Sequence, residues 1–405
     1  MKYILFDDSS WSNFFPITLT RSTGDLRVGI LKLRQRILSY FGLQETNIII
    51  SSILEKIYRE RHKKWQVNKL TAEDTIFINS RLKVDENITK KIKKLSLNSC
   101  LFHENTILAA RLIPKAGKML AEDIHDLFMK QKKIEVEKKY TWEYLWEFIK
   151  ENAAYIKRDF RDFFYEKDNL FGTEPGVTVI NPYNVWIGEK ADIMPGVIID
   201  ATKGPVVLDE NVKIMANSVI IGPVYIGKNS TIKAGAKIYE GTSVGPVCKI
   251  GGEVEGTIFQ AYTNKQHDGF LGHSYLGEWV NIGADTNNSD LKNNYKNVAV
   301  YFCAEGKKID SGSQFVGTFI GDHTKTGINS TINTGTVIGV GCNLFGRELI
   351  TDFIPSFSWG HASNLSEYIE DEFLETAEIV KKRRKLKLTV NEKELYRNIR
   401  KIGFE

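Results

Sequence analysis

The stretch LDENVKIMANSVIIGPVYIGKNSTIKAGAKIYEGTSVGPVCKI, residues 208–250, places a branched aliphatic side chain at every sixth position. Neither a helix, with a period of 3.6, nor an ordinary strand, with a period of 2, produces this spacing. A triangular prism does, because each flat side takes six residues and points one aliphatic side chain inward. The stretch therefore predicts a parallel β-helix. The positions are Leu208, Ile214, Ile220, Ile226, Ile232, Ile238, Val244 and Ile250.

The same spacing continues outside this stretch and sets the limits of the predicted β-helix at residues 176–346. Two segments interrupt it, residues 256–271 and 287–317, and we expect both to bulge out as loops. Irregular loops on repeat scaffolds often carry function. The further positions are Ile187, Ile193, Ile199, Leu276, Ile282, Ile320, Thr326, Ile332, Ile338 and Leu344.

The segments on either side predict two other regions. In residues 1–165, short apolar runs at 3–6, 47–51 and 75–79 are typical of buried parallel strands, with helical patterns between them. This indicates an α/β domain, joined to the β-helix by an aromatic helix over 140–164. Residues 347–405 form a C-terminal extension with an amphipathic helix and a basic tail. We expect it to cap the open end of the β-helix, where an unpaired edge would invite aggregation.

Composition excludes several classes of function. The 405 residues carry 55 Lys and Arg against 50 Asp and Glu, a net charge of +5 that makes no case for binding nucleic acid. No apolar run approaches the roughly 18 residues that span a bilayer, and the first residues do not resemble a signal peptide. Four cysteines without metal-binding spacing fit a reducing cytoplasm.

Three side chains near the first interruption are candidates on residue type alone. His267 lies in a polar, glycine-flanked stretch, and histidine suits proton transfer near neutral pH. Most loop histidines are exposed and have no catalytic role, and the sequence by itself favours this interpretation for His267. Lys249 and Glu253 occupy outward positions of the repeat. They could bind phosphate and orient a base, or form a surface pair, and the sequence favours neither.

The segment HDGFLGHSYLGEWVNIGADT, residues 267–286, resembles the acetyltransferase signature of the bifunctional GlmU family. Residues 264–272 and 286–295 resemble motifs of an alternative bacterial group of GlmU-like sugar nucleotidyltransferases. GlmU enzymes acetylate glucosamine 1-phosphate and then uridylylate it. The resemblance implies a nucleotidyltransferase-like α/β domain followed by a left-handed β-helix. It also implies a homotrimer with acetyl-CoA bound between neighbouring coils.

The resemblance assigns roles in the β-helix. His267 would be the general base that deprotonates the sugar amine, and Asn281 would line the same pocket. Lys296 falls where the family has a sugar-phosphate lysine, and Asn264 and Lys265 belong to the shared motif. Two departures stand out. The tyrosine expected three residues after the histidine is Phe270, and a later Asn-Tyr pair is replaced by Asp290-Leu291.

The N-terminal domain keeps less of the nucleotidyltransferase pattern. Its first strand is followed by Asp7-Asp8-Ser9-Ser10-Trp11 instead of a glycine-rich loop. The motif Arg-Ser-Thr-Gly-Asp-Leu-Arg-Val-Gly resembles the alternative group's own, and its arginines could clamp phosphates. Mg²⁺ is the expected cofactor, with Asp7, Asp25 or Asn152 as alternative ligands and no choice among them. The predicted nucleotide-binding residues are Arg21, Asp25, Arg27, Gly29, Asn79 and Arg81, and the predicted metal ligands are Asp25 and Asn152.

We therefore expect a cytoplasmic enzyme that makes UDP-N-acetylglucosamine or a similar activated amino sugar. It would transfer acetyl from acetyl-CoA to the amine of a sugar 1-phosphate, and a nucleotidyl group from UTP. One alternative is a nucleotidyltransferase whose β-helix only trimerises it, favoured by Phe270 and by Asp290-Leu291. Acetyl transfer alone is favoured by the missing glycine-rich loop. A non-catalytic sensor of a sugar nucleotide is a third alternative, against which the retained His267 argues.

Overall fold

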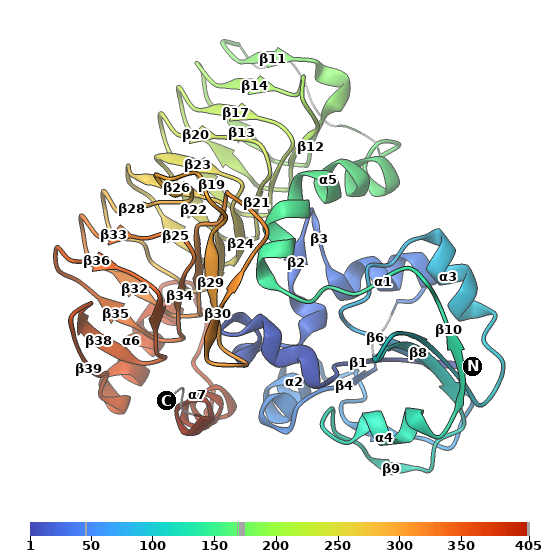
Figure 1. The fold of residues 1–405 in the computed structure, drawn as a ribbon. Coiled ribbons are helices and arrows are strands. Elements are labelled where there is room, and N and C mark those ends of the chain that lie inside the picture. The colour runs from blue at the N-terminus through green and yellow to red at the C-terminus, as the bar shows by residue number, and fades with distance from the viewer. Residues whose placement is uncertain (45–46, 168, 170–174, 403–405) are drawn as a thin grey trace.

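The computed structural model describes residues 1–44, 47–167, 169 and 175–402. It contains an N-terminal α/β domain, a long β-helix and two C-terminal helices (Figure 1). None of the helices in these described ranges is both long and apolar enough to cross a membrane.

The N-terminal domain is built on a six-stranded sheet in the order β10-β7-β8-β6-β1-β4. β6, β1 and β4 pair in parallel and are largely buried, as their apolar runs predict, whereas β6 pairs antiparallel with β8. On the other side of β8, β7 pairs with it in an antiparallel arrangement. The strands are β1 Lys2–Phe6, β4 Ile48–Ile49, β6 Thr75–Asn79, β7 Ser99–His103, β8 Thr106–Leu112 and β10 Lys132–Glu135; the helices are α1 Leu33–Phe41, α2 Glu55–Arg61, α3 Glu86–Lys93 and α4 Ile124–Met129.

The β-helix has three sides, as the period of six predicts. The eight aliphatic residues of the repeat are fully buried in a single core. One side is a nine-stranded parallel sheet that faces the N-terminal domain. Its strands are β12 Val185–Ile187, β15 Val206–Leu208, β18 Val224–Ile226, β21 Thr242–Val244, β24 Ile258–Ala261, β27 Tyr275–Glu278, β31 Thr318–Ile320, β34 Thr336–Ile338 and β37 Phe353–Ile354.

The other two sides are interrupted along the axis. The first contains β11 Thr178–Ile180, β14 Ile198–Asp200, β17 Val219–Ile221, β20 Lys237–Ile238, β23 Glu253–Glu255 and β26 Phe270–Gly272, then β28 Asn287–Asn288, β33 Thr331–Ile332 and β36 Leu349–Ile350. The second, here called the G side, contains β13 Asp192–Ile193, β16 Lys213–Ile214, β19 Thr231–Ile232, β22 Lys249–Ile250 and β25 Asn264–Lys265, then β32 Lys325–Thr326, β35 Asn343–Leu344 and β38 Ser358–His361. Parallel pairing thus extends past residue 346. β39 Asn364–Glu367 then pairs antiparallel with β38.

The two predicted interruptions differ in outcome. Residues 256–271 do not form a loop, because β24, β25 and β26 continue all three sides. The coil is shortened at its corners instead. Val244 therefore pairs with Phe259, which is nearer in sequence than a complete coil of three six-residue sides would place its partner. In the second interruption, residues 287–288 still form β28 of the coil, and the chain leaves the coil after them. The segment that leaves the coil carries an antiparallel hairpin of β29 Ala299–Phe302 and β30 Lys307–Asp310.

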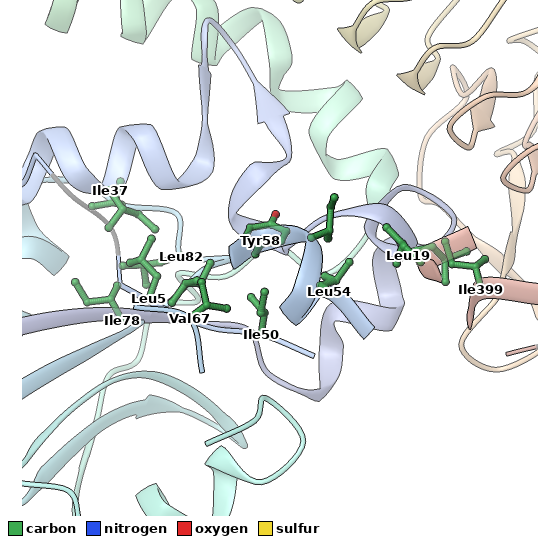
Figure 2. Close-up of a cluster of buried hydrophobic side chains, with 14 of the residues drawn as sticks. Leu5, Leu19, Ile37, Ile50, Leu54, Tyr58, Val67, Ile78, Leu82 and Ile399 are labelled. Atoms are coloured by element: carbon green, nitrogen blue, oxygen red, sulfur yellow. The ribbon is translucent and has the colours of Figure 1, made fainter. Parts of the chain in front are cut away.

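Helices connect the regions. The predicted aromatic helix is α5 Leu145–Phe163, which packs between β2 Arg27–Val28 and the β-helix (Figure 1). The C-terminal helices are α6 Glu370–Lys382 and α7 Val390–Ile402. Their packing is not limited to the β-helix. They join the core of the N-terminal domain, where Ile399 lies close to Leu19 (Figure 2).

Candidate functional site

A cavity of about 250 Å³ lies where the three regions meet. The N-terminal domain contributes the 3-10 turns after β1, the start of α1, and α2. The β-helix contributes two corners, and the C-terminal extension contributes α6, α7 and the segment between them. The lining residues are Arg21, Asp25, Lys32, Arg34, Tyr58, Arg61, His62, Tyr262, Glu278, Trp279, Lys381, Leu386 and Glu392.

Asp25 anchors one wall of this interdomain cavity. Its Oδ1 lies 3.2 Å from Lys32 Nζ and 2.7 Å from Arg34 Nε, and its Oδ2 accepts a hydrogen bond from Tyr58. Burial alone would raise the pKa of Asp25, but Lys32 and Arg34 hold it well below the usual value. The carboxylate is therefore ionised, and it positions two cations at the cavity wall.

Arg21 also lines the cavity and reaches the β-helix. One terminal nitrogen donates to Asp322, while Nη1 lies 3.7 Å from Glu278 Oε1. Nη1 is buried and, among the described residues, has no hydrogen-bond partner. A buried donor without a partner costs about 1–3 kcal/mol, so this atom is a ready contact for a ligand in the cavity.

Another wall belongs to the C-terminal extension. Glu392 accepts from Lys381, with Nζ 2.5 Å from Oε1, and lies 3.0 Å from Arg61 Nη2. The cavity is lined in all by five Lys and Arg side chains and three carboxylates. This excess of positive charge in a partly desolvated space favours an anionic ligand.

Two flat aromatic pairs border the cations. His62 stacks on Trp65 at 3.6 Å between ring centroids, and Arg34 lies over the same indole. Burial lowers the pKa of His62 to about 4, so its ring is neutral at pH 7. Tyr262 stacks on Trp279 at 4.2 Å, at two successive corners of the β-helix. These rings offer flat apolar surfaces beside the anion-binding side chains.

Arg27 and Gly29, at the end of the Arg21–Gly29 motif, lie outside the cavity and contact the β-helix. The Arg27 backbone N–H donates to Tyr275 Oη at 2.8 Å, and the guanidinium lies over Tyr225. Gly29 has φ +67° and donates to Asn152 Oδ1 at 2.6 Å. A Cβ on Gly29 would lie 2.6 Å from Asp159 Oδ2. In this arrangement Arg27 and Gly29 act in domain docking and do not form a phosphate clamp with Arg21.

Asn79 and Arg81 form a separate cluster at the end of β6. Both bind Asp8: Asn79 Nδ2 lies 2.7 Å from its Oδ2, and the Arg81 guanidinium contacts both oxygens. Arg81 also donates to the Trp142 carbonyl. The amide of Asn79 is therefore already engaged, by Asp8 and by the Ile107 carbonyl.

The predicted metal ligands do not converge. Asn152 is fully buried and bridges Gly29 to the Gly241 carbonyl, 2.6 Å from its Nδ2, while Asp25 is held by two cations. Asp7 accepts from Ser22 and Thr23, and burial raises its pKa to about 7. Within the described ranges no three His, Cys, Asp or Glu side chains form a metal-binding group. These residues do not fit a resident Mg²⁺ ion.

The candidates in the β-helix also separate. His267 is exposed at a corner, and Lys296 is exposed in the 287–317 insertion. Glu253 lies 3.8 Å from Lys237 on an outer face. Lys265 points into the coil, where its Nζ donates to the carbonyls of Gly251 at 3.0 Å and His267 at 2.9 Å. Its ammonium is therefore used inside the core, and burial lowers its pKa to about 8.

The structure does bring three of the predicted residues together. Lys249, Asn264 and Asn281 are neighbours on the G side. They line a second pocket of about 330 Å³ with Lys325 and with Arg383 and Arg384 of the basic run. This G-side pocket shares Tyr262 and Trp279 with the interdomain cavity.

Sequence reasoning missed a histidine that has a carboxylate partner. His273 Nδ1 lies 2.7 Å from Asp290 Oδ2, and Phe315 packs against the ring. His267 has no ion pair or hydrogen bond to its ring among the described residues. His273 stands in the same signature as His267, but its partner comes from the insertion seventeen residues later. The replacement of Asn-Tyr by Asp290-Leu291 was the signal that could have identified it.

Comparison with known proteins agrees with this division of the chain. Residues 3–166 match the family model of sugar nucleotidyl transferases. Residues 205–240 match the bacterial transferase hexapeptide family, with six repeats. The N-terminal domain is thus nucleotidyltransferase-like, and the β-helix is a hexapeptide-repeat domain.

Curated relatives carry both kinds of domain in their names. A bifunctional sugar-1-phosphate nucleotidylyltransferase/acetyltransferase of Sulfurisphaera tokodaii is 37% identical over 149 residues, 35% of this chain and 36% of that protein. The bifunctional protein GlmU of Trichormus variabilis is 31% identical over 205 residues, 45% and 41% of the two chains. The matches thus span less than half of these relatives. A solved LpxA, a UDP-N-acetylglucosamine acyltransferase of Bacteroides fragilis, is 19% identical at a TM-score of 0.33, over 52% of this chain and 80% of that one.

Proposed function

We propose that this chain is an enzyme that makes an activated amino sugar, and that the interdomain cavity performs nucleotidyl transfer to a sugar 1-phosphate. The observation that carries the proposal is the excess of cations around the cavity, together with Arg21 Nη1, which has no hydrogen-bond partner within the described part of the chain. The match of residues 3–166 to sugar nucleotidyl transferases supports it.

The cavity would act mainly by positioning charged groups. A phosphate oxygen of the sugar 1-phosphate attacks the α-phosphorus of the nucleoside triphosphate, a P–O bond forms, and pyrophosphate leaves. Arg21, Lys32 and Arg61 would hold the phosphates and offset the charge that builds on them. The Tyr262–Trp279 pair offers a stacking surface for a base or a sugar ring. UTP is the nucleotide that the GlmU-like relatives suggest.

Acetyl transfer in the β-helix is the second candidate activity, and the His273–Asp290 contact favours it. The His273 ring would accept a proton from the sugar amine while the amine attacks the thioester carbonyl of acetyl-CoA, and the thiol of CoA leaves. Asp290 would fix the ring orientation and stabilise the imidazolium. His267 is the alternative base. Asn264, Asn281 and Lys249 are proposed to contact the substrate from the G-side pocket, with Lys296 from the insertion.

The assembly and compartment belong to the same proposal. A homotrimer is proposed because hexapeptide β-helices of this kind associate through their flat sides, and cyclic symmetry suits a site between copies. A cytoplasmic location is supported by four cysteines that form no disulfide, three of them buried.

A coupled assay tests the proposal directly. Glucosamine 1-phosphate, acetyl-CoA, UTP and Mg²⁺ are supplied together and then with each omitted, while free thiol and pyrophosphate are followed separately. Release of both supports two activities. Pyrophosphate alone, from sugar that is already acetylated, reduces the β-helix to a scaffold, and thiol alone removes nucleotidyl transfer. Release of neither product with any amino-sugar phosphate contradicts the proposal and favours a sensor.

A further inference from the structure

The G-side pocket joins the β-helix to the C-terminal extension. On the β-helix, Lys249 pairs in register with Asn264, Asn264 with Asn281, and Asn281 with Lys325. Neighbouring strands lie about 4.8 Å apart, so these four outward side chains form one continuous row. Val380, Arg383 and Arg384, at the end of α6 and just beyond it, form the facing wall of a pocket of about 330 Å³.

The facing wall is held against the row. Arg384 Nη2 donates to Asn264 Oδ1 at 3.1 Å, and Phe373, Leu374 and Ala377 anchor α6 in the core that it shares with the N-terminal domain. Arg384 is therefore fixed against the β-helix, and the neighbouring Arg383 lines the same pocket while remaining exposed to solvent.

The pocket contains positive charge without a counter-charge. Lys249, Lys325, Arg383 and Arg384 line it, and no carboxylate is among its described lining residues. Lys325 Nζ donates to the His323 carbonyl at 3.0 Å, so the ammonium is satisfied only in part. Burial lowers the pKa of Lys325 to about 8, and burial with the nearby Arg384 lowers that of Lys249. Four cations held together in this way favour a bound anion.

We propose that the G-side pocket binds the phosphate groups of a ligand, and that Arg383 and Arg384 of the C-terminal extension complete the site. The cations contact phosphate oxygens, and the amide groups of Asn264 and Asn281 donate further hydrogen bonds. The site is separate from the interdomain cavity, although the Tyr262–Trp279 pair borders both. A sugar phosphate, a nucleoside diphosphate and the phosphates of CoA share this chemistry.

Titration calorimetry on the full-length chain tests the proposal, with inorganic pyrophosphate, UDP and CoA as separate probes. The paired substitution Arg383→Gln with Arg384→Gln, and Lys249→Gln alone, should each weaken binding of at least one probe about tenfold or more. Lys387→Gln removes a charge from the same segment at an exposed position outside the pocket, and it should change affinity less than about twofold.

The probes identify the source of the phosphate. Tighter binding of CoA than of UDP and pyrophosphate assigns the pocket to acetyl-CoA, and the reverse order assigns it to a nucleotide or sugar phosphate. Binding that survives both pocket variants and disappears with Lys32→Gln belongs to the interdomain cavity and overturns the proposal. So does the absence of binding by all three probes.

The proposal and the proposed function fail independently. Pyrophosphate and thiol release are measured on the same preparations. If the wild type turns over no amino-sugar phosphate, and the pocket variants lose the anion binding that the wild type shows, the proposed function is wrong and the phosphate-binding pocket is supported. If the wild type is active, and the pocket variants bind the anions as tightly as the wild type does, only the proposal for the pocket is wrong.

Discussion

His273 owes its orientation to Asp290, because Nδ1 of the ring lies 2.7 Å from Asp290 Oδ2 and this contact holds the ring in place. Asp290→Asn keeps the shape and removes the charge that stabilises the imidazolium. We expect acetyl transfer to fall about 10²-fold or more, and pyrophosphate release to stay unchanged. Initial rates of thiol release measure this effect. His267→Ala is the comparison: the opposite pattern, a large loss with His267→Ala and none with Asp290→Asn, would return the role of base to His267.

Lys325 predicts how anion binding in the G-side pocket depends on pH. Its pKa is lowered to about 8 by burial, so the ammonium is present below this pH and lost above it. Lys249, Arg383 and Arg384 also face the pocket, and the two arginines stay charged throughout. We expect pyrophosphate affinity to fall about three- to tenfold between pH 7 and pH 9.5. Calorimetry checks this, and Lys325→Arg should flatten the profile. An equally steep profile in Lys325→Arg would assign the titration to another group.

The close packing of α5 against the segment around Gly29 requires a residue without a side chain at that position. The φ of +67° at Gly29 is unfavourable for other residues, and a Cβ would overlap Asp159 and the Tyr155 backbone. We expect Gly29→Ala to lower the free energy of unfolding by about 1–3 kcal/mol from backbone strain, with the overlap adding to it. Gly42→Ala is a matched control, with φ +69° and open space around its Cβ. Urea denaturation compares the two, and equal losses would show that the overlap costs nothing.

At the scale of elements, the sequence predicted what is periodic. The step of six from Leu208 to Ile250 gives the three sides and the core, because each inward position is fixed by its neighbours in the repeat. The prediction from this spacing was wrong for the residues directly after Ile250. Inward residues then follow at Val254 and Phe259, in steps of four and five, and the next inward position is the charged Lys265, so the pattern looked like a loop. A coil can shorten at its corners without losing strand pairing, and the repeat alone does not reveal this.

At the scale of the whole molecule, the candidate site was only partly predictable. Arg21 and Asp25 do line the cavity, and Lys249, Asn264 and Asn281 do meet in one pocket. Their partners are Asp322, in a late coil, and Arg383 and Arg384, beyond the β-helix. Contacts between residues so far apart in the chain depend on how complete domains dock. No local pattern carries that information.

The docking interface predicts that the chain unfolds as one unit. The N-terminal domain and the β-helix share buried polar contacts: Ser243 Oγ donates to the Gly29 carbonyl at 2.8 Å, and Asn152 of α5 bridges Gly29 to Gly241. α6 and α7 pack into the N-terminal core as well. We therefore expect a single calorimetric transition for the wild type, since neither domain can melt without exposing the other's buried groups.

Asn152→Ala tests this coupling. It removes a fully buried amide and leaves the Gly29 N–H and the Gly241 carbonyl without that partner, each costing about 1–3 kcal/mol. We expect a lower midpoint and, if the joint carries the cooperativity, a split into two transitions. Asn87→Ala, which removes a partly exposed amide from α3 at a distance from the joint, should change the midpoint little. Two transitions already in the wild type would contradict the coupling, because the domains would then be stable independently of their shared cavity.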